Sequence, residues 1–376
     1  MTTQRPADVV KRAARVVVKI GSTSVTAPDG DVDASAISRL CDEVAALRDA
    51  GLQVVIVTSG AISSGWQAMG RGPRPTDMAT LQAVAAVGQH RLMRVYADAL
   101  GDRGHIAGQV LLAPLDCVHR QQYLDARQTL TRLLELGVVP VVNENDATSD
   151  DEIRFGDNDR LAALVAHLVS ADTLVLLTDT PGLLSADPRL GTDASLIEEV
   201  VEIDHELERV AGGTGSVLGS GGMASKLAAA KMATWSGVRV VIADASRPGV
   251  VRSAVDGQPG VGTVFRPKSR RLPARKPWIA FAVGAIGTVT VDAGARSALV
   301  EREASLLPAG VLGVKGRFYA DDAVEIAGPD GKVFAKGIVR HDSVQVASWA
   351  GRHSSDLPEG VAPELVHRDD LVVIAI

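Results

Sequence analysis

Residues 16–24 read V-V-V-K-I-G-S-T-S: three β-branched residues, a lysine, one more apolar residue, then a glycine and three hydroxyl side chains. A short, nearly continuous apolar run of this kind is typical of a strand buried on both faces of a parallel sheet. Lys19 lies near the end of that run, where a charged side chain is uncommon unless it has a partner or a task. We therefore predict a strand at Val16–Ile20 and a phosphate-binding role for Lys19. A solvated lysine in an ordinary surface turn is the alternative.

The same kind of run recurs along the chain, and longer segments with helical periodicity lie between the runs. The clearest helical segment extends from Ile37 to Leu47, with Gly51 just past its end. Regular alternation of strands and helices predicts an α/β fold: a mainly parallel sheet sandwiched by helices. The other predicted strands are Val54–Thr58, Ile106–Leu112, Val138–Val142, Thr173–Thr178 and Val238–Ala243.

The composition changes at Arg266–Pro277, which holds six basic residues, three prolines and no acidic residue. This segment has the features of a linker. Short alternating runs with frequent glycine turns follow it, and they predict a small β-rich domain. The predicted organisation is a first domain over residues 1–265, a linker over 266–277 and a β-rich domain with a C-terminal extension over 278–376. The predicted β-rich runs are Thr288–Val291, Gly310–Val314, Ala323–Ile326, Lys332–Ala335, Ile338–Val339 and Leu371–Ile376.

Composition argues against several classes of protein. The net charge is −6 over 376 residues, which gives no global reason to expect a nucleic acid or an anionic membrane as partner. The two cysteines, Cys41 and Cys117, are too few for a disulfide framework or a zinc cluster. No apolar stretch is long enough to span a membrane, and Lys19 interrupts the first apolar run too early for a signal peptide. We therefore expect a cytoplasmic protein.

Ligands of an open α/β sheet bind beyond the carboxyl ends of its strands, so the residues that follow each run are the candidates for chemistry. Ser59 and Gly60 follow the second run and lead through small residues into a helix. Such a turn presents backbone N–H groups to an anion, although a tight turn that merely requires glycine explains the pattern equally well.

Amide and carboxylate side chains follow the fourth run. Amides can bind both ends of an amino acid, and carboxylates can bind an ammonium group or Mg²⁺. We assign the charged segment Asp150–Glu152 to a solvated loop, and Asp157 is alternatively an N-cap for a helix that begins near Arg160. The residues for which we favour a functional role are Asn145, Asp146, Asn158 and Asp159.

Two further segments fit a nucleotide. The polar turn at Thr178 and Asp179 follows the fifth run, although the Pro-Gly pair after it is also an ordinary turn signal. The segment Gly212–Gly222 holds six glycines in eleven residues and enters a helix that carries Lys226. A flexible loop that leads into such a helix is more typical of a phosphate-binding clamp than of a disordered linker. No Walker motif is present, and the G-x-G-x-x-A at Gly219–Ala224 lacks the strand that a dinucleotide fingerprint needs before it.

Together these blocks closely resemble the glutamate 5-kinases of the amino-acid kinase superfamily, and the tail resembles the PUA domain attached to many bacterial members. The resemblance covers nearly the whole chain. Each block alone is modestly specific, but six blocks in the same order are highly specific. The blocks are K-I-G-S at Lys19–Ser22, V-T-S-G-A-I at Val57–Ile62, N-E-N-D at Asn143–Asp146, G-D-N-D at Gly156–Asp159, L-T-D at Leu177–Asp179 and G-G-M-A-S-K at Gly221–Lys226, with H-R-D-D at His367–Asp370 in the tail.

The resemblance implies phosphorylation of the side-chain carboxylate of L-glutamate by ATP and Mg²⁺, the first step of proline synthesis. It assigns transition-state roles to Lys19, Lys226, Asp159 and Gly60, with Asp159 orienting the lysines. It assigns glutamate binding to Ser59, Asn145, Asp146 and Asn158. It assigns ATP binding to Lys19, Thr178, Asp179, Ser220, Gly221, Gly222, Met223, Ala224, Ser225 and Lys226, with Mg²⁺ held mainly by the ATP phosphates. Arg160 and Ser220 stand where some relatives have an amide and a threonine, which leaves their local contacts open.

The resemblance also implies a homo-oligomer, dimeric or tetrameric, feedback inhibition by proline and transfer of the product to a glutamyl phosphate reductase. The nearest alternative is a related amino-acid kinase with another acceptor, such as acetylglutamate, aspartate, carbamate or a nucleoside monophosphate. An RNA-binding role through the PUA-like tail is the alternative of a different class. The tail has few aromatic residues on which bases could stack, and we disfavour that role.

Overall fold

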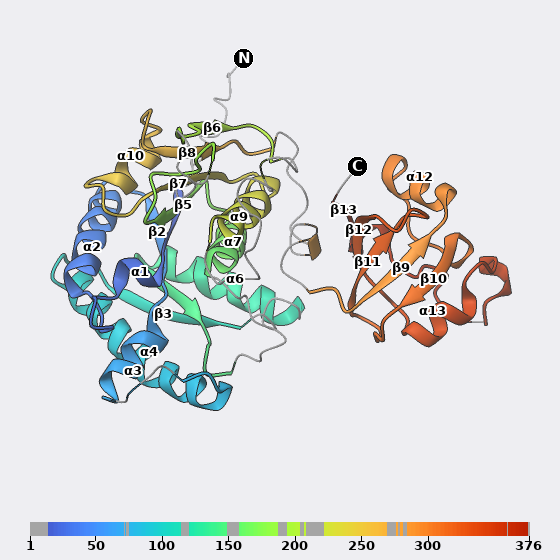
Figure 1. The fold of residues 1–376 in the computed structure, drawn as a ribbon, viewed down its shortest axis with the longest axis horizontal. Coiled ribbons are helices and arrows are strands. Elements are labelled where there is room, and N and C mark those ends of the chain that lie inside the picture. The colour runs from blue at the N-terminus through green and yellow to red at the C-terminus, as the bar shows by residue number, and fades with distance from the viewer. Residues whose placement is uncertain are drawn as a thin grey trace, which may run out of the picture.

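The computed structural model describes residues 14–70, 72, 75–113, 120–148, 158–186, 194–203, 207, 222–268, 276, 279–280, 284–358 and 360–374. Within this part of the chain, a large sheet with helices on both faces is followed by a smaller, antiparallel-rich sheet, as Figure 1 shows. The predicted α/β fold with a second β-rich unit is therefore confirmed. The predicted limits of the domains stay predictions.

The large sheet has eight strands in the order β3-β4-β2-β1-β5-β7-β8-β6. Neighbouring strands from β3 to β7 are parallel, whereas β8 runs antiparallel to β7 and parallel to β6. The carboxyl ends of the six parallel strands therefore meet at one edge of the sheet. The strands are β1 (Arg15–Ile20), β2 (Gln53–Val57), β3 (Ala107–Leu112), β4 (Val139–Glu144), β5 (Thr173–Thr178), β6 (Glu199–Val200), β7 (Arg239–Asp244) and β8 (Gly262–Phe265).

Two hydrophobic layers enclose this sheet. One layer packs α1, α2, α4 and α10 against it, and the other packs α6, α7 and α9. Helix α3 lies against α4. The helices are α1 (Ser22–Val25), α2 (Ala34–Asp49), α3 (Ala61–Ala68), α4 (Met78–Gly101), α6 (Arg120–Glu135), α7 (Asn158–Leu168), α9 (Met223–Trp235) and α10 (Val250–Asp256).

The central strand β1 contributes alternate side chains to the two layers. Val16, Val18 and Ile20 belong to the layer of α2 and α4, whereas Val17 belongs to the layer of α7 and α9. Because side chains of a strand alternate between its faces, Lys19 lies on the same face as Val17. The sequence pattern of β1 thus directs its lysine toward α7 and α9.

Helices α3 and α4 approach each other so closely that only glycine fits at their crossing. A Cβ atom at Gly65 would overlap the backbone of Val84, and one at Gly88 would overlap the carbonyl oxygen of Ala61. Neither glycine has a positive φ, so the requirement comes from contact between the two backbones. This crossing sets the position of α4 relative to the turn that precedes α3.

The smaller sheet has the strand order β10-β9-β11-β12-β13, with a single parallel pair between β9 and β11. Its core includes the buried aromatic side chains of Phe318 and Phe334. The strands are β9 (Gly287–Val291), β10 (Val311–Lys315), β11 (Ala323–Ala327), β12 (Val333–Ile338) and β13 (Leu371–Val373). The helices are α12 (Ala293–Glu301), α13 (Ser343–Trp349) and three 3₁₀ turns, Pro308–Gly310, Ser354–Asp356 and Arg368–Asp370.

Most of the predicted strands occur within one or two residues of their expected limits, and three details differ. The short strands β6 and β8 were not predicted, because neither carries a long apolar run. The two runs at 332–335 and 338–339 form one strand, β12, that continues through Gly337. Helix α7 begins at Asn158 rather than near Arg160, so two of the candidate site residues lie in its first turn.

Two further expectations concern burial. Cys41 is a core residue as predicted, and burial raises the pKa of its thiol to about 12; Cys117 lies outside the described residues. Among the helices of the described residues, none is both long enough and apolar enough to cross a membrane.

The glycine crossing gives a first prediction. We expect Gly88→Ala to lower the free energy of unfolding by about 2 to 3 kcal/mol, because the added methyl group must push two backbones apart. Gly101→Ala is the matched control in the same helix, since a Cβ there meets nothing, and it should change stability by less than about 1 kcal/mol. Thermal unfolding of both variants tests this, and equal stabilities would contradict the close crossing.

A second prediction concerns Lys336 of β12, which is 8% exposed. Burial lowers the pKa of its ammonium group from 10.5 to about 8; the charge of Arg160 acts in the same direction and that of Glu325 opposes it. Between these two pKa values the unfolded chain holds a proton that the folded chain has lost, so stability should rise with pH in that window. Below it, the folded state bears the cost of a buried charge.

We therefore expect Lys336→Met to raise the free energy of unfolding at pH 7 by up to about 3 kcal/mol and to give a smaller gain at pH 10. The measurement is the difference in Tm between variant and wild type at both pH values. Lys332→Met, an exposed lysine beside the same strand, is the control and should show little change. A gain for Lys336→Met that did not depend on pH would contradict the lowered pKa.

Candidate active site

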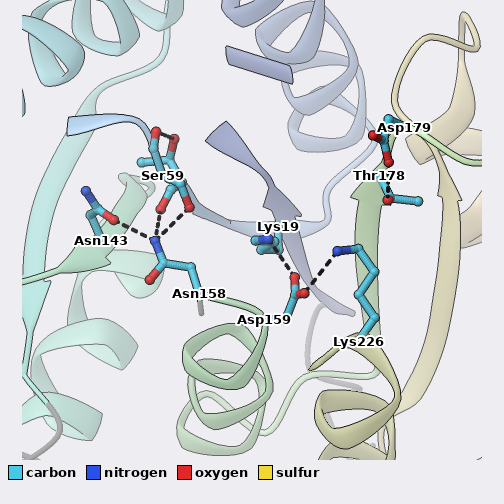
Figure 2. A network of polar contacts seen from close by, with 9 residues as sticks. Lys19, Ser59, Asn143, Asn158, Asp159, Thr178, Asp179 and Lys226 are labelled. Atoms are coloured by element: carbon cyan, nitrogen blue, oxygen red, sulfur yellow. Dashed lines mark hydrogen bonds and ion pairs between the residues drawn. The ribbon is translucent and has the colours of Figure 1, made fainter. Parts of the chain in front are cut away.

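The candidate site lies at the edge of the large sheet where β4, β2, β1 and β5 end side by side. Asn143 lies at the end of β4, Ser59 just after β2, Lys19 near the end of β1, and Thr178 at the end of β5. The order of the strands therefore lays out these residues in a row. Figure 2 shows the row, with Asn143 and Ser59 on one side of Lys19 and Thr178 with Asp179 on the other.

Two buried lysines converge on one carboxylate at the centre of the row. The Lys19 ammonium lies 2.6 Å from one oxygen of Asp159, and the Lys226 ammonium lies 3.1 Å from the other. The Lys226 contact is also a hydrogen bond. The three residues come from β1, α7 and α9, and α7 packs against α9 on the face toward which Lys19 points.

These three side chains are almost fully withdrawn from water: the exposed fractions are 3% for Lys19, 0% for Asp159 and 5% for Lys226. Removing an ammonium group from water costs several kcal/mol, which a close carboxylate offsets. Asp159 thus brings two ammonium groups close together at the centre of the site. Such a centre suits an anion with delocalised charge, for example a phosphoryl group in transfer.

Beside the triad, the chain makes a sharp turn from β2 into α3. Gly60 is the N-cap of α3 and has φ 105° and ψ 1°, a left-handed conformation that favours glycine. A Cβ there would also lie 3.1 Å from a methyl group of Val25. The Thr58 hydroxyl anchors the turn through a 2.9 Å hydrogen bond with the Tyr96 hydroxyl, and burial raises the pKa of that phenol. The turn thus holds the start of α3 beside Lys19.

Three polar residues meet on the β4 side of the triad. The Asn158 amide nitrogen lies 2.6 Å from the Thr58 carbonyl oxygen, 2.8 Å from the Ser59 hydroxyl oxygen and 2.8 Å from the Asn143 side-chain oxygen. Asn158 directly precedes Asp159 in the first turn of α7. The amide cluster and the lysine triad are therefore held by the same helix end.

A cavity of about 330 Å³ opens next to the amide cluster, within the size range of small-molecule sites. Its polar lining combines amides, carboxylates and an imidazole, a set that can bind both an ammonium and a carboxylate group. The residues that provide this lining are Gln89, His90, Gln109, Glu144, Asn145 and Asp146. Asn145 and Asp146, predicted from the sequence, thus share a cavity with side chains that the sequence analysis did not select.

Thr178 and Asp179 lie on the opposite side of the triad. The Thr178 hydroxyl donates a 3.1 Å hydrogen bond to the Asp179 carboxylate, so the turn after β5 is internally ordered. Gly222 is the N-cap of α9, and Met223, Ala224, Ser225 and Lys226 form the first turn of that helix. Of the predicted site residues, Ser220 and Gly221 lie outside the described residues, as do Gly156 and Asp157.

Sequence reasoning missed Gln89, whose side-chain oxygen accepts a 2.8 Å hydrogen bond from the Asn143 amide nitrogen across 54 positions of the chain. It lies in the middle of α4, away from any strand end, where the rule that located the other candidates does not apply. In the local sequence, Gln89 is marked only by the preceding Gly88. The role of Gly88 becomes apparent only once α3 and α4 are known to cross there.

Comparisons with known proteins identify the families to which the two parts of the chain are similar. A sequence model described as the amino acid kinase family matches residues 14–244. The chain belongs to the amino acid kinase family. A PUA domain model matches residues 287–361 of this kinase-family chain. Both family assignments made from the sequence blocks are confirmed.

Relatives of this kinase-family chain are similar over almost their whole length. A glutamate 5-kinase of Mycolicibacterium vanbaalenii is 47% identical, over 98% of this chain and 99% of the relative. One of Trichlorobacter lovleyi is 45% identical over 97% and 98%. One of Mycobacterium avium is 45% identical over the full length of both chains.

Proposed function

We propose that this chain transfers the γ-phosphoryl group of ATP to the side-chain carboxylate of L-glutamate, forming L-glutamyl 5-phosphate. The observation that carries the proposal is the order of groups across the sheet edge. A polar cavity and an amide cluster lie on one side, the buried lysine triad in the middle, and the Thr178–Asp179 turn on the other. An amino-acid acceptor, a phosphoryl group and a nucleotide fit these three positions in that order. The similarity to glutamate 5-kinases supports the same substrate.

The reaction needs little covalent assistance from the protein. The side-chain carboxylate of glutamate has an ordinary pKa of about 4.3, so it is already ionised and needs no general base. One of its oxygens attacks the γ-phosphorus while the bond to the bridging oxygen of ADP breaks. Lys19 and Lys226 stabilise the charge that develops on the transferring group, and Asp159 holds both lysines in place. The backbone at Gly60 lets the start of α3 approach the same group.

The proposed donor is ATP accompanied by Mg²⁺. In the part of the chain that the structure describes, no group of three or more His, Cys, Asp or Glu side chains could hold a metal ion. We propose that phosphate oxygens supply most of the ligands of the magnesium ion, as is common for this ion. When bound, it would neutralise phosphate charge. The protein side of the ATP site would comprise Thr178, Asp179 and the segment Ser220–Lys226.

The glutamate end would lie in the cavity beside Ser59 and Asn158, with Asn145 and Asp146 in its lining. We further propose, from the family resemblance, a cytoplasmic homo-oligomer, a dimer or a tetramer, that proline inhibits. The acyl phosphate product would pass to a glutamyl phosphate reductase. The PUA domain gives RNA binding as a second candidate function; the acidic net charge of −6 disfavours it as the main one.

A substrate panel tests the choice of acceptor. We expect ADP release with L-glutamate and much less with acetylglutamate, aspartate, carbamate or a nucleoside monophosphate, because the cavity offers groups for both a free ammonium and a carboxylate. A coupled assay of ADP formation measures this directly. Turnover of another acceptor in preference to glutamate would replace the proposed substrate and leave the kinase assignment intact.

The role of Lys226 has its own test. We expect Lys226→Ala to lower kcat more than tenfold, because it removes one of two charges that stabilise the transferring group, while the circular dichroism spectrum stays that of the wild type. Lys231→Ala, a lysine of the same helix that is not part of the triad, is the control and should keep kcat within about threefold. Unchanged turnover in Lys226→Ala would remove Lys226 from the catalytic centre.

A further inference from the structure

Three side-chain amides form a hydrogen-bonded chain that runs from α4 to the catalytic helix α7. Gln89 accepts a hydrogen bond from Asn143, and Asn143 accepts one from Asn158, each of 2.8 Å. The exposed fractions of the three residues are 9%, 1% and 8%. An amide donates from its nitrogen and accepts at its oxygen, so such a chain has a direction.

Backbone groups settle that direction. The Thr58 carbonyl oxygen can only accept, so the Asn158 atom 2.6 Å from it must be the amide nitrogen. The backbone N–H of Glu144 can only donate, so the Asn143 atom 2.9 Å from it must be the side-chain oxygen. The nitrogen of Asn143 therefore faces Gln89, which must present its oxygen. The polarity follows from chemistry and needs no choice of rotamer for any of the three amides.

The direction determines what the end of the chain offers. Three acceptors surround the Asn158 nitrogen and share its two hydrogens, and among the described residues none donates a hydrogen bond to its side-chain oxygen. Asn158 thus presents an acceptor next to Asp159. Without Gln89, the Asn143 amide nitrogen would lose its printed acceptor, and Asn143 would be held less firmly against Asn158.

Gln89 reaches Asn143 because α4 lies unusually close to α3. Gly88 directly precedes Gln89 and is the residue whose missing Cβ lets α4 contact the backbone at Ala61. Gln89 also lines the cavity beside Glu144, Asn145 and Asp146. The glycine crossing, the cavity wall and the amide chain therefore meet at one position of α4.

We propose that Gln89 is a positioning residue for the acceptor substrate: it holds the Asn143 amide in place, and through it that of Asn158, in the orientation that the backbone at Thr58 and Glu144 sets. The proposal rests on the proposed function for the identity of the substrate. Its geometric part, the polarity of the amide chain, does not depend on which amino acid binds. Gln89 acts through Asn143 and is not itself a catalytic residue.

The first test separates acceptor binding from nucleotide binding. Gln89→Met keeps the side-chain length but removes the hydrogen-bond acceptor for Asn143. We expect it to raise KM for glutamate at least tenfold and to leave KM for ATP within about twofold. Gln121→Met, which changes an exposed glutamine of α6 outside the cavity, is the control and should leave KM for glutamate within about twofold. An equal rise in KM for glutamate in Gln121→Met, or an equal rise in KM for ATP in Gln89→Met, would overturn the proposal.

The second test uses the direction of the chain. In Gln89→Glu the carboxylate can still accept from Asn143. In Asn143→Asp the new carboxylate still accepts from Asn158 and Glu144, and Gln89 can turn to donate its nitrogen. The double variant places two carboxylates against each other, which repel unless one takes up a proton, so its rise in KM should exceed the product of the two single effects at least tenfold. Independent effects that simply multiply would overturn the proposal.

Thermal unfolding keeps the two hypotheses distinguishable. In the double variant, the fall in Tm should likewise exceed the sum of the falls in the two single variants, whatever the acceptor substrate. If wild-type protein fails to turn over glutamate while this non-additivity in Tm persists, the proposed substrate is wrong and the amide chain stands. If Tm shifts add in the four proteins of the cycle, the amide chain is wrong.

Discussion

The site depends on one electrostatic constraint: two ammonium groups withdrawn from water must lie against a buried carboxylate. Lys19 and Lys226 satisfy it at the two oxygens of Asp159. The constraint requires β1 to present its lysine on the face covered by α7 and α9, and it requires α7 to begin early enough to place Asp159 in its first turn. Breaking such a pair is costly, because it leaves an uncompensated buried charge.

A second constraint is steric and acts through glycine. Gly60 takes a left-handed conformation at the start of α3, and Gly65 and Gly88 let α3 and α4 touch through their backbones. These contacts place Gln89 against Asn143 and so extend the influence of α4 to Asn158. The electrostatic triad and the amide chain meet at the first turn of α7, where Asn158 and Asp159 are consecutive. One helix end thus serves both the acceptor side and the phosphoryl side of the proposed reaction.

Local patterns were sufficient to predict much of this. The apolar runs predicted β1, β2, β4, β5 and β7 closely, because strands buried on both faces need such runs. They missed β6 and β8, which are short and lie at the far edge of the sheet, and they divided β12 at Gly337. Candidate residues at or just after the strand ends, such as Lys19, Ser59 and Thr178, were selected because ligands bind beyond strand ends. Gln89 lies on a helix and was not found by that rule.

The sequence by itself determined the alternation of strands and helices, the identity of the polar residues at the strand ends and the lysine in β1, since these depend on periodicity and on neighbours along the chain. Only the tertiary structure decided which of those residues meet. Asp159 and Lys226 are 67 positions apart and Gln89 and Asn143 are 54 apart. Their contacts exist because helix packing, and the absence of a side chain at Gly88, bring distant segments within hydrogen-bond range. Periodicity carries no information about such distances.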